Sequence, residues 1–87
     1  MQADKQAVGN LLKTARGQID GILKMIEDDR YCIDISTQLM AAQSVLKKAN
    51  KLVIEAHLNH CVKEAVEQNN AEEKIREIMG IIDKLSK

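Results

Sequence analysis

The chain has 87 residues, enough for one domain, and its formal net charge of zero argues against a general binder of polyanions. Apolar residues make up 45% of it but aromatic residues only 1%, and proline is absent. A core built from Leu, Ile, Val, Met and Ala predicts helices rather than sheet. No apolar run resembles a signal peptide or reaches the length of a membrane span, so we expect a cytoplasmic protein without a membrane partner.

The first predicted helix covers about residues 5–27. Its apolar residues recur at alternating spacings of four and three, as on one face of a helix. Gly17 and Gly21 lie within it, four residues apart on one face, where glycine allows another backbone to approach closely. The charged residues 27–30 then break the pattern and predict a short connection.

The second predicted helix, about residues 32–67, is the main feature of the sequence. Apolar and small residues follow one another from Cys32 to His60 at alternating spacings of three and four, and neither glycine nor proline interrupts them. Large residues alternate with alanines along this seam. Small residues at such positions would let a partner helix come close.

The third predicted helix covers about residues 71–86 and is expected to pack across the ends of the two longer helices. The whole chain, residues 1–87, then forms a single helical domain. A short turn makes an antiparallel hairpin of the first two helices, and one such hairpin cannot cover its own apolar surface. We therefore expect an all-α, three-helix protomer whose hairpins pair as an antiparallel four-helix bundle, with a homodimer as the smallest assembly.

His57 and Cys61 are the first candidate metal ligands, because a spacing of four puts both side chains on one face of the helix, one turn apart. His60 is next to Cys61 in sequence, so its side chain projects about 100° away and chelates poorly with that cysteine. Alone, a His and a Cys at this spacing are more often ordinary surface and core residues. In a reducing cytosol, however, paired cysteines are more often metal ligands or redox centres than structural disulfides.

Cys32 is the third candidate ligand, but it cannot join the other two within one chain. It precedes His57 by 25 residues on the same predicted helix. At about 1.5 Å per residue, the separation is roughly 37 Å. An antiparallel partner helix removes this obstacle if the two-fold axis lies near Val45 and Leu46. Cys32 of one chain then approaches His57 and Cys61 of its neighbour, and the dimer holds two such sites.

Two thiolates and one imidazole form a soft ligand set of low coordination number. Soft sulfur ligands favour Cu(I), and Zn(II) is the competing candidate. Zinc normally takes four ligands, so water or His60 would have to complete its site. Tyr31 and an acidic residue of the third helix are candidates for a hydrogen bond to the second ring nitrogen of His57.

Three stretches of the chain resemble the copper-sensitive operon repressor family, CsoR, whose relatives respond to nickel or cobalt, formaldehyde or persulfide. They are RGQIDGI at 16–22, KMIEDDRYCIDI at 24–35 and HLNHCV at 57–62, and the resemblance spans nearly the whole chain. A cysteine followed later by His-x-x-x-Cys is specific to the copper branch. The resemblance implies a three-helix protomer in a dimer of dimers, a homotetramer that represses copper-export genes and leaves DNA when Cu(I) binds.

The same resemblance implies roles for individual side chains. Cys32, His57 and Cys61 would be the Cu(I) ligands, shared across the dimer. Tyr31 and Glu77 would hydrogen-bond the histidine.

Contacts to operator DNA are expected from basic side chains of the first two helices, namely Lys13, Arg16, Lys47 and Lys48. Contacts of this kind with phosphate give a salt-dependent affinity that is largely independent of DNA sequence. Arginines that the family usually carries nearby are replaced here by Leu11, Thr14 and Gln43.

The sequence therefore predicts a Cu(I)-responsive transcriptional repressor that releases operator DNA when copper binds. One alternative is a thiol or persulfide sensor of the same fold, although that chemistry would not need His57. Another is a copper-binding or buffering protein without DNA binding, which the replaced arginines favour. An enzyme with a small-molecule substrate is not expected, because no oxyanion stabiliser or pocket signature accompanies the Cys–His pair.

Overall fold

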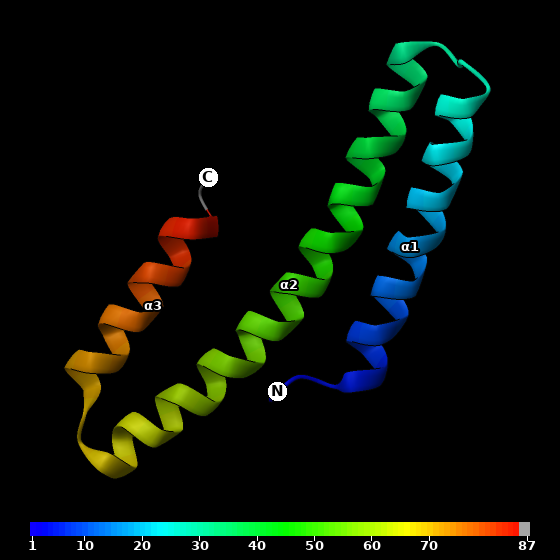
Figure 1. Ribbon diagram of the computed structural model, residues 1–87. Helices are drawn as coiled ribbons and strands as arrows, with labels where there is room; N and C mark the ends of the chain where they lie inside the picture. The colour runs from blue at the N-terminus through cyan, green and yellow to red at the C-terminus, as the bar shows by residue number, and fades with distance from the viewer. Residues whose placement is uncertain (86–87) are drawn as a thin grey trace.

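The computed structural model describes residues 1–85, which form three helices: α1 (Lys5–Glu27), α2 (Cys32–Gln68) and α3 (Ala71–Leu85) (Figure 1). No strand occurs in this range. The all-α, three-helix protomer that the sequence predicts is therefore confirmed. Residue 86, the last of the third predicted helix, lies outside the described residues.

The connection between α1 and α2 is tight because backbone hydrogen bonds close the end of α1. The N–H of Arg30 donates to the carbonyl of Met25 at 3.0 Å, and the N–H of Asp29 donates to the carbonyl of Ile26 at 3.1 Å. With Asp29 in the left-handed region at φ 53°, these two bonds make a Schellman motif. The motif reverses the chain within a few residues, so that α2 runs antiparallel to α1.

The second connection places α3 differently from the sequence-based expectation. Asn69 ends α2 in the left-handed conformation at φ 55°, and α3 begins two residues later. The chain therefore turns back on itself, and α3 runs along the C-terminal half of α2 (Figure 1). Among the described residues α3 contacts α2 but not α1. The expectation that it packs across the ends of both longer helices was wrong.

The interior of the protomer is mainly a seam between α1 and α2. Five buried residues belong to it and recur at intervals of seven in each helix, as in coiled coils: Val8, Ala15, Ile22, Ala42 and Ala49. Ala42 and Ala49 are two of the alanines expected to contact a partner helix, and they lie along the stretch of α2 that the chain's own α1 covers. The sixth buried apolar residue of the described chain, Cys61, lies nearer the other end of α2.

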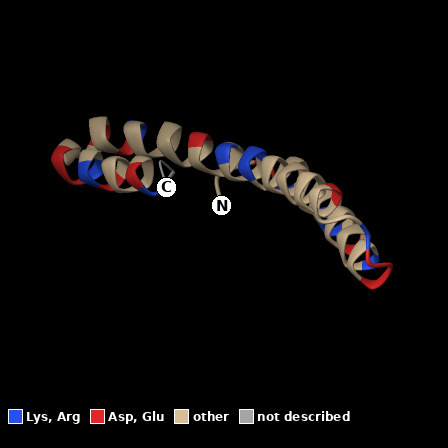
Figure 2. Ribbon diagram, turned by 90° about the horizontal axis from the view of Figure 1, so that it is seen from above, with Lys and Arg blue, Asp and Glu red and all other residues tan. Residues whose placement is uncertain are grey.

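The protomer is a thin layer of helices, as the view from above shows (Figure 2). Its Cα atoms extend over 57 × 27 × 12 Å, and their radius of gyration is 17.5 Å. A compact domain of this length would have a radius of about 12 Å. One layer of helices cannot enclose a core, and Leu23, Leu39 and Leu46 remain 54%, 47% and 43% exposed.

The exposed apolar surface is the area that the predicted partner hairpin would cover. Gly17 and Gly21 also fit an uncovered surface, because a Cβ atom built on either would meet nothing within 4 Å in the protomer. A close backbone approach at these two glycines is therefore not made within one chain. None of the helices, over residues 1–85, combines the length and apolar character that a membrane span requires.

Candidate metal centre

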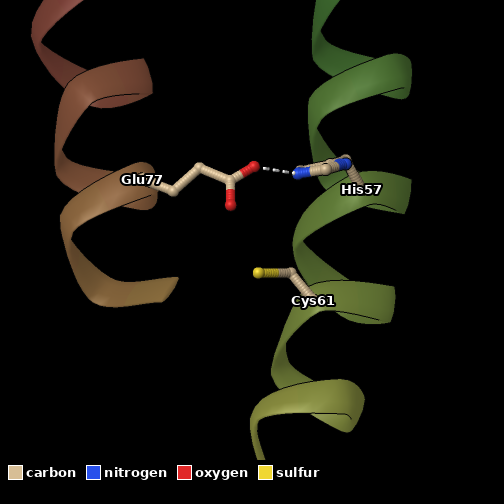
Figure 3. Close-up of side chains that lie close together, drawn as sticks. All are labelled: His57, Cys61 and Glu77. Atoms are coloured by element: carbon tan, nitrogen blue, oxygen red, sulfur yellow. Dashed lines mark hydrogen bonds and ion pairs between the residues drawn. The ribbon is translucent and has the colours of Figure 1, made fainter. Parts of the chain in front are cut away.

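His57 and Cys61 of α2 and Glu77 of α3 form one cluster of metal-ligating side chains (Figure 3). One ring nitrogen, the Sγ atom and one carboxylate oxygen all lie within 4.8 Å of one another. The spacing of four puts His57 and Cys61 on the face of α2 that α3 covers. The turn after α2 then brings Glu77 opposite them, although it lies 20 residues after His57 in sequence.

A short hydrogen bond orients the histidine. His57 Nε2 lies 2.7 Å from Glu77 Oε1. This bond is the main reason that the pKa of Glu77 lies below its ordinary value; partial desolvation opposes the shift and the charge of Lys74 adds to it. An ionised carboxylate only accepts hydrogen bonds, so the imidazole proton resides on Nε2. The other ring nitrogen, Nδ1, points away from Glu77 (Figure 3).

Further charged side chains extend the cluster along the α2–α3 contact. Lys74 Nζ lies 3.8 Å from Glu77 Oε2 and 3.9 Å from Glu64 Oε2. The other carboxylate oxygen of Glu64 lies 3.5 Å from His60 Nε2. His60 is therefore turned toward Glu64, in agreement with the argument that it is a poor chelating partner for Cys61.

The two cysteines have opposite surroundings, and both are free thiols. Cys61 is 1% exposed, whereas Cys32 is exposed as the first residue of α2. Tyr31, the residue before α2, is 66% exposed. The protomer thus brings together His57, Cys61 and Glu77, and it leaves Cys32 and Tyr31 at the far end of the same helix.

The four basic side chains expected to contact DNA lie on the two hairpin helices: Lys13 and Arg16 on α1, Lys47 and Lys48 on α2. All four are exposed, and none forms an ion pair with another described residue. Acidic residues gather instead at the turn between α1 and α2, at one end of the molecule (Figure 2). The four side chains are therefore accessible to phosphate groups.

Residues 4–84 match the metal-sensitive transcriptional repressor family. The chain belongs to this family. The copper-sensing transcriptional repressor CsoR of Bacillus subtilis is 37% identical over 84 residues, which cover 97% of this chain and 83% of that protein.

Two solved structures of metal-responsive regulators are similar over almost the whole chain. The Cu(I)-bound copper-sensing repressor CsoR of Geobacillus thermodenitrificans NG80-2 is 38% identical, with a TM-score of 0.81, and the match covers 100% of this chain and 94% of that one. The nickel-responsive transcriptional regulator InrS is 26% identical, with a TM-score of 0.84, over 97% and 94%. Since the backbone matches a copper and a nickel regulator with similar TM-scores, the metal must be inferred from the donor atoms.

Lys74 and Glu64 are the members of the cluster that sequence reasoning missed. Lys74 precedes Glu77 by three residues and Glu64 follows His60 by four, spacings that bring helical side chains together. Those spacings were the available signal. The contact between Lys74 and Glu64 joins α2 to α3, and it depends on a helix packing that spacing within one helix does not reveal.

Proposed function

We propose that this chain is a Cu(I)-responsive transcriptional repressor that binds operator DNA without copper and releases it when Cu(I) binds. The observation that carries the proposal is the arrangement of ligands along α2. His57 and Cys61 lie together, with the imidazole held by Glu77, and the only other cysteine lies at the opposite end of the same helix. The names of its copper-sensing relatives support the same function.

The ligands would be Cys32 of one subunit with His57 and Cys61 of the other, in a homodimer that can pair further into a homotetramer. Because Nε2 of His57 donates to Glu77, Nδ1 is the nitrogen available to the metal. Two thiolates and one imidazole suit Cu(I), and zinc would still lack a fourth ligand. Tyr31, next to Cys32, would arrive at the histidine together with that cysteine.

The switch requires that copper bind one quaternary arrangement more tightly than the other. A metal bridge between Cys32 and the His57–Cys61 pair of the other subunit has this property, because it forms only when the two α2 helices are correctly placed. Glu77 would transmit any movement of His57 to α3. The DNA contacts would come from the exposed basic side chains of the hairpin, Lys13, Arg16, Lys47 and Lys48.

The alternative functions have less support. A persulfide sensor needs accessible thiolates, but Cys61 is 1% exposed in the protomer. A copper buffer without DNA binding would not require membership of a family of transcriptional repressors. The proposed repressor uses the whole chain as one metal-sensing and DNA-binding domain and works in the cytoplasm, where thiols stay reduced. No enzymatic step is part of this function.

The test is DNA binding by the full-length, reduced protein under anaerobic conditions. Operator fragments are first selected from genomic DNA with the metal-free protein, and their affinity is then measured by fluorescence anisotropy as Cu(I) is added. We expect the affinity to fall at one Cu(I) per subunit, and the Cys32→Ala variant to stay bound at all copper concentrations. Unchanged affinity of the wild-type protein at saturating Cu(I) would contradict the proposed function.

A further inference from the structure

Charge is distributed unevenly along the hairpin, although the chain as a whole has no net charge. Residues 5–19 of α1 and 35–54 of α2 carry six basic side chains and no acidic one. Because the hairpin is antiparallel and turns at residues 28–31, these two stretches lie largely side by side. We call them together the basic band, and it occupies the middle of the molecule.

Acidic regions border the basic band on both sides. Residues 20–34, around the turn, carry five acidic and two basic side chains, and residues 55–77 carry six acidic and three basic ones. The acid-free stretch of α2 is roughly 30 Å long, enough for a double helix to lie across it. Phosphate is attracted to the band and repelled by its borders. The charge pattern therefore favours DNA that crosses α2 over DNA that runs along it.

The third helix brings one more lysine to the basic band. The C-terminal end of α3 lies beside the middle of α2 (Figure 1), where Lys84 lines a hollow together with Asn50 and Ile54. Ile54 also borders an adjoining hollow, which is lined by the three lysines of the band on α2. Lys84 is exposed and forms no ion pair with any of residues 1–85. Its ammonium group is thus available to an anion from outside the protomer.

We propose that Lys51 and Lys84 also contact operator phosphates, so that DNA lies across the middle of α2 and touches α3 directly. The inference rests on the proposed function, because it names further side chains for the same DNA contact. Lys51 lies 3.9 Å from Glu55, and both side chains are more than half exposed. Such a surface pair is weak, so a phosphate oxygen can take the place of the carboxylate.

A contact through Lys84 links DNA to the helix that holds the proposed copper ligand His57. Glu77 is hydrogen-bonded to His57 at 2.7 Å. Lys84 follows Glu77 by seven residues, or two helical turns, so both side chains project from the same side of α3 about 10 Å apart along its axis. A movement of the histidine on metal binding would therefore reach a DNA contact through one continuous helix.

The salt dependence of DNA binding counts the phosphate contacts. Full-length, reduced, metal-free protein is titrated against a fluorescent operator duplex at several salt concentrations. Lys51→Ala and Lys84→Ala should each lower the slope of log affinity against log salt by about 0.9. Lys24→Ala is the matched control, because it removes an exposed lysine of α1 that lies in the acidic border. It should leave the slope unchanged.

The response to copper tests the role of α3. The factor by which Cu(I) weakens DNA binding reflects the groups whose DNA contacts differ between the two forms of the protein. We expect Lys84→Ala to lower this factor several-fold, because the contact carried by α3 is missing in both forms. Lys24→Ala should keep the wild-type factor.

An unchanged salt slope in Lys51→Ala or Lys84→Ala would overturn the inference and leave the proposed repressor intact, as would a wild-type copper factor in Lys84→Ala. If both slopes fall but Cu(I) leaves the DNA affinity of the wild-type protein unchanged, the proposed function is contradicted and the two phosphate contacts stand. All three variants replace exposed side chains, and helical circular dichroism verifies their fold.

Discussion

The two ends of α2 differ in how much of the proposed metal site each one builds. At the C-terminal end, Cys61 is buried and His57 is held by Glu77. At the N-terminal end, Cys32 and Tyr31 are exposed, and Tyr31 provides no side-chain capping bond to the helix. At the C-terminal end the side chains are already held together without a metal, whereas the N-terminal end offers only an exposed, free cysteine.

This difference follows from which helix covers each end. α3 lies along the C-terminal half of α2 and supplies a carboxylate and an ammonium group to the histidine's surroundings. α1 covers the N-terminal half through an apolar seam, and Cys32 is left exposed as a free thiol. A long helix that carries complementary half-sites at its two ends is suited to joining with a second copy in the antiparallel direction. The predictions with the largest expected effects test whether the two half-sites of neighbouring chains form one metal site.

Mixing two inactive variants should restore metal sites, which is the largest effect we expect. Cys32→Ala and Cys61→Ala homodimers should each lose the Cu(I) site. When the variants are unfolded together and refolded in equal amounts, about half of the dimers are mixed, and each mixed dimer has one intact site of two. Recovery of about a quarter of the wild-type Cu(I) capacity is expected by anaerobic titration. No recovery above the separate variants would show that the two ends do not share a site.

The two histidines of α2 should differ strongly in their effect on Cu(I). His57→Ala removes a proposed ligand, so the affinity should fall by more than the roughly 10–100-fold that loss of an outer partner costs. His60→Ala removes only the contact with Glu64 and should stay within about tenfold of wild type. Competition with a Cu(I) chelator measures both variants. Equal losses in the two would contradict the ligand assignment.

A smaller effect is expected from charge removal on the hairpin. Lys47→Ala should weaken operator binding several-fold for all DNA sequences and reduce the salt dependence by about 0.9 in the slope of log affinity against log salt. Lys63→Ala, an exposed lysine on the C-terminal half of α2, is the control and should leave the slope unchanged. Fluorescence anisotropy at several salt concentrations measures both. A slope that responds to Lys63 instead would move the DNA surface to the other end of α2.

The smallest effect concerns stability and acid. The pKa of Glu77 is lowered in the folded protein, chiefly by the hydrogen bond to His57, so the ionised carboxylate stabilises the fold. This contribution is complete above the unfolded pKa of about 4.3 and is lost as the pH falls through the lower folded value. Thermal unfolding of wild type and Glu77→Gln should therefore differ slightly near neutral pH and converge on acidification. Glu73→Gln should follow the wild type throughout.

The sequence predicted the helices well, and also the separation of Cys32 from His57 along α2, because both depend on local periodicity. An uninterrupted apolar seam from Cys32 to His60 requires one long helix, and the rise of a helix then separates Cys32 from His57. The spacing of four likewise places His57 beside Cys61, as the structure shows. These results need no knowledge of how helices pack.

The position of α3 could not be predicted in the same way. It depends on the left-handed backbone at Asn69, and the sequence shows only polar residues where the turn occurs. Residue patterns alone therefore indicate an acidic residue of the third helix, and only the family resemblance points to Glu77. The contacts of Lys74 with Glu77 and Glu64 depend on the same turn, so they first become visible in three dimensions.

The thinness of the protomer has a consequence for the amount of protein a cell must keep. Over the described residues the Cα atoms span 12 Å in one direction and few side chains are buried, so we expect association with other copies to contribute much of the folding free energy. Stability gained by association increases with protein concentration. Dilution should lower the thermal midpoint of the metal-free protein and expose it to proteolysis, so a cell that makes too little of this chain would lose it by degradation.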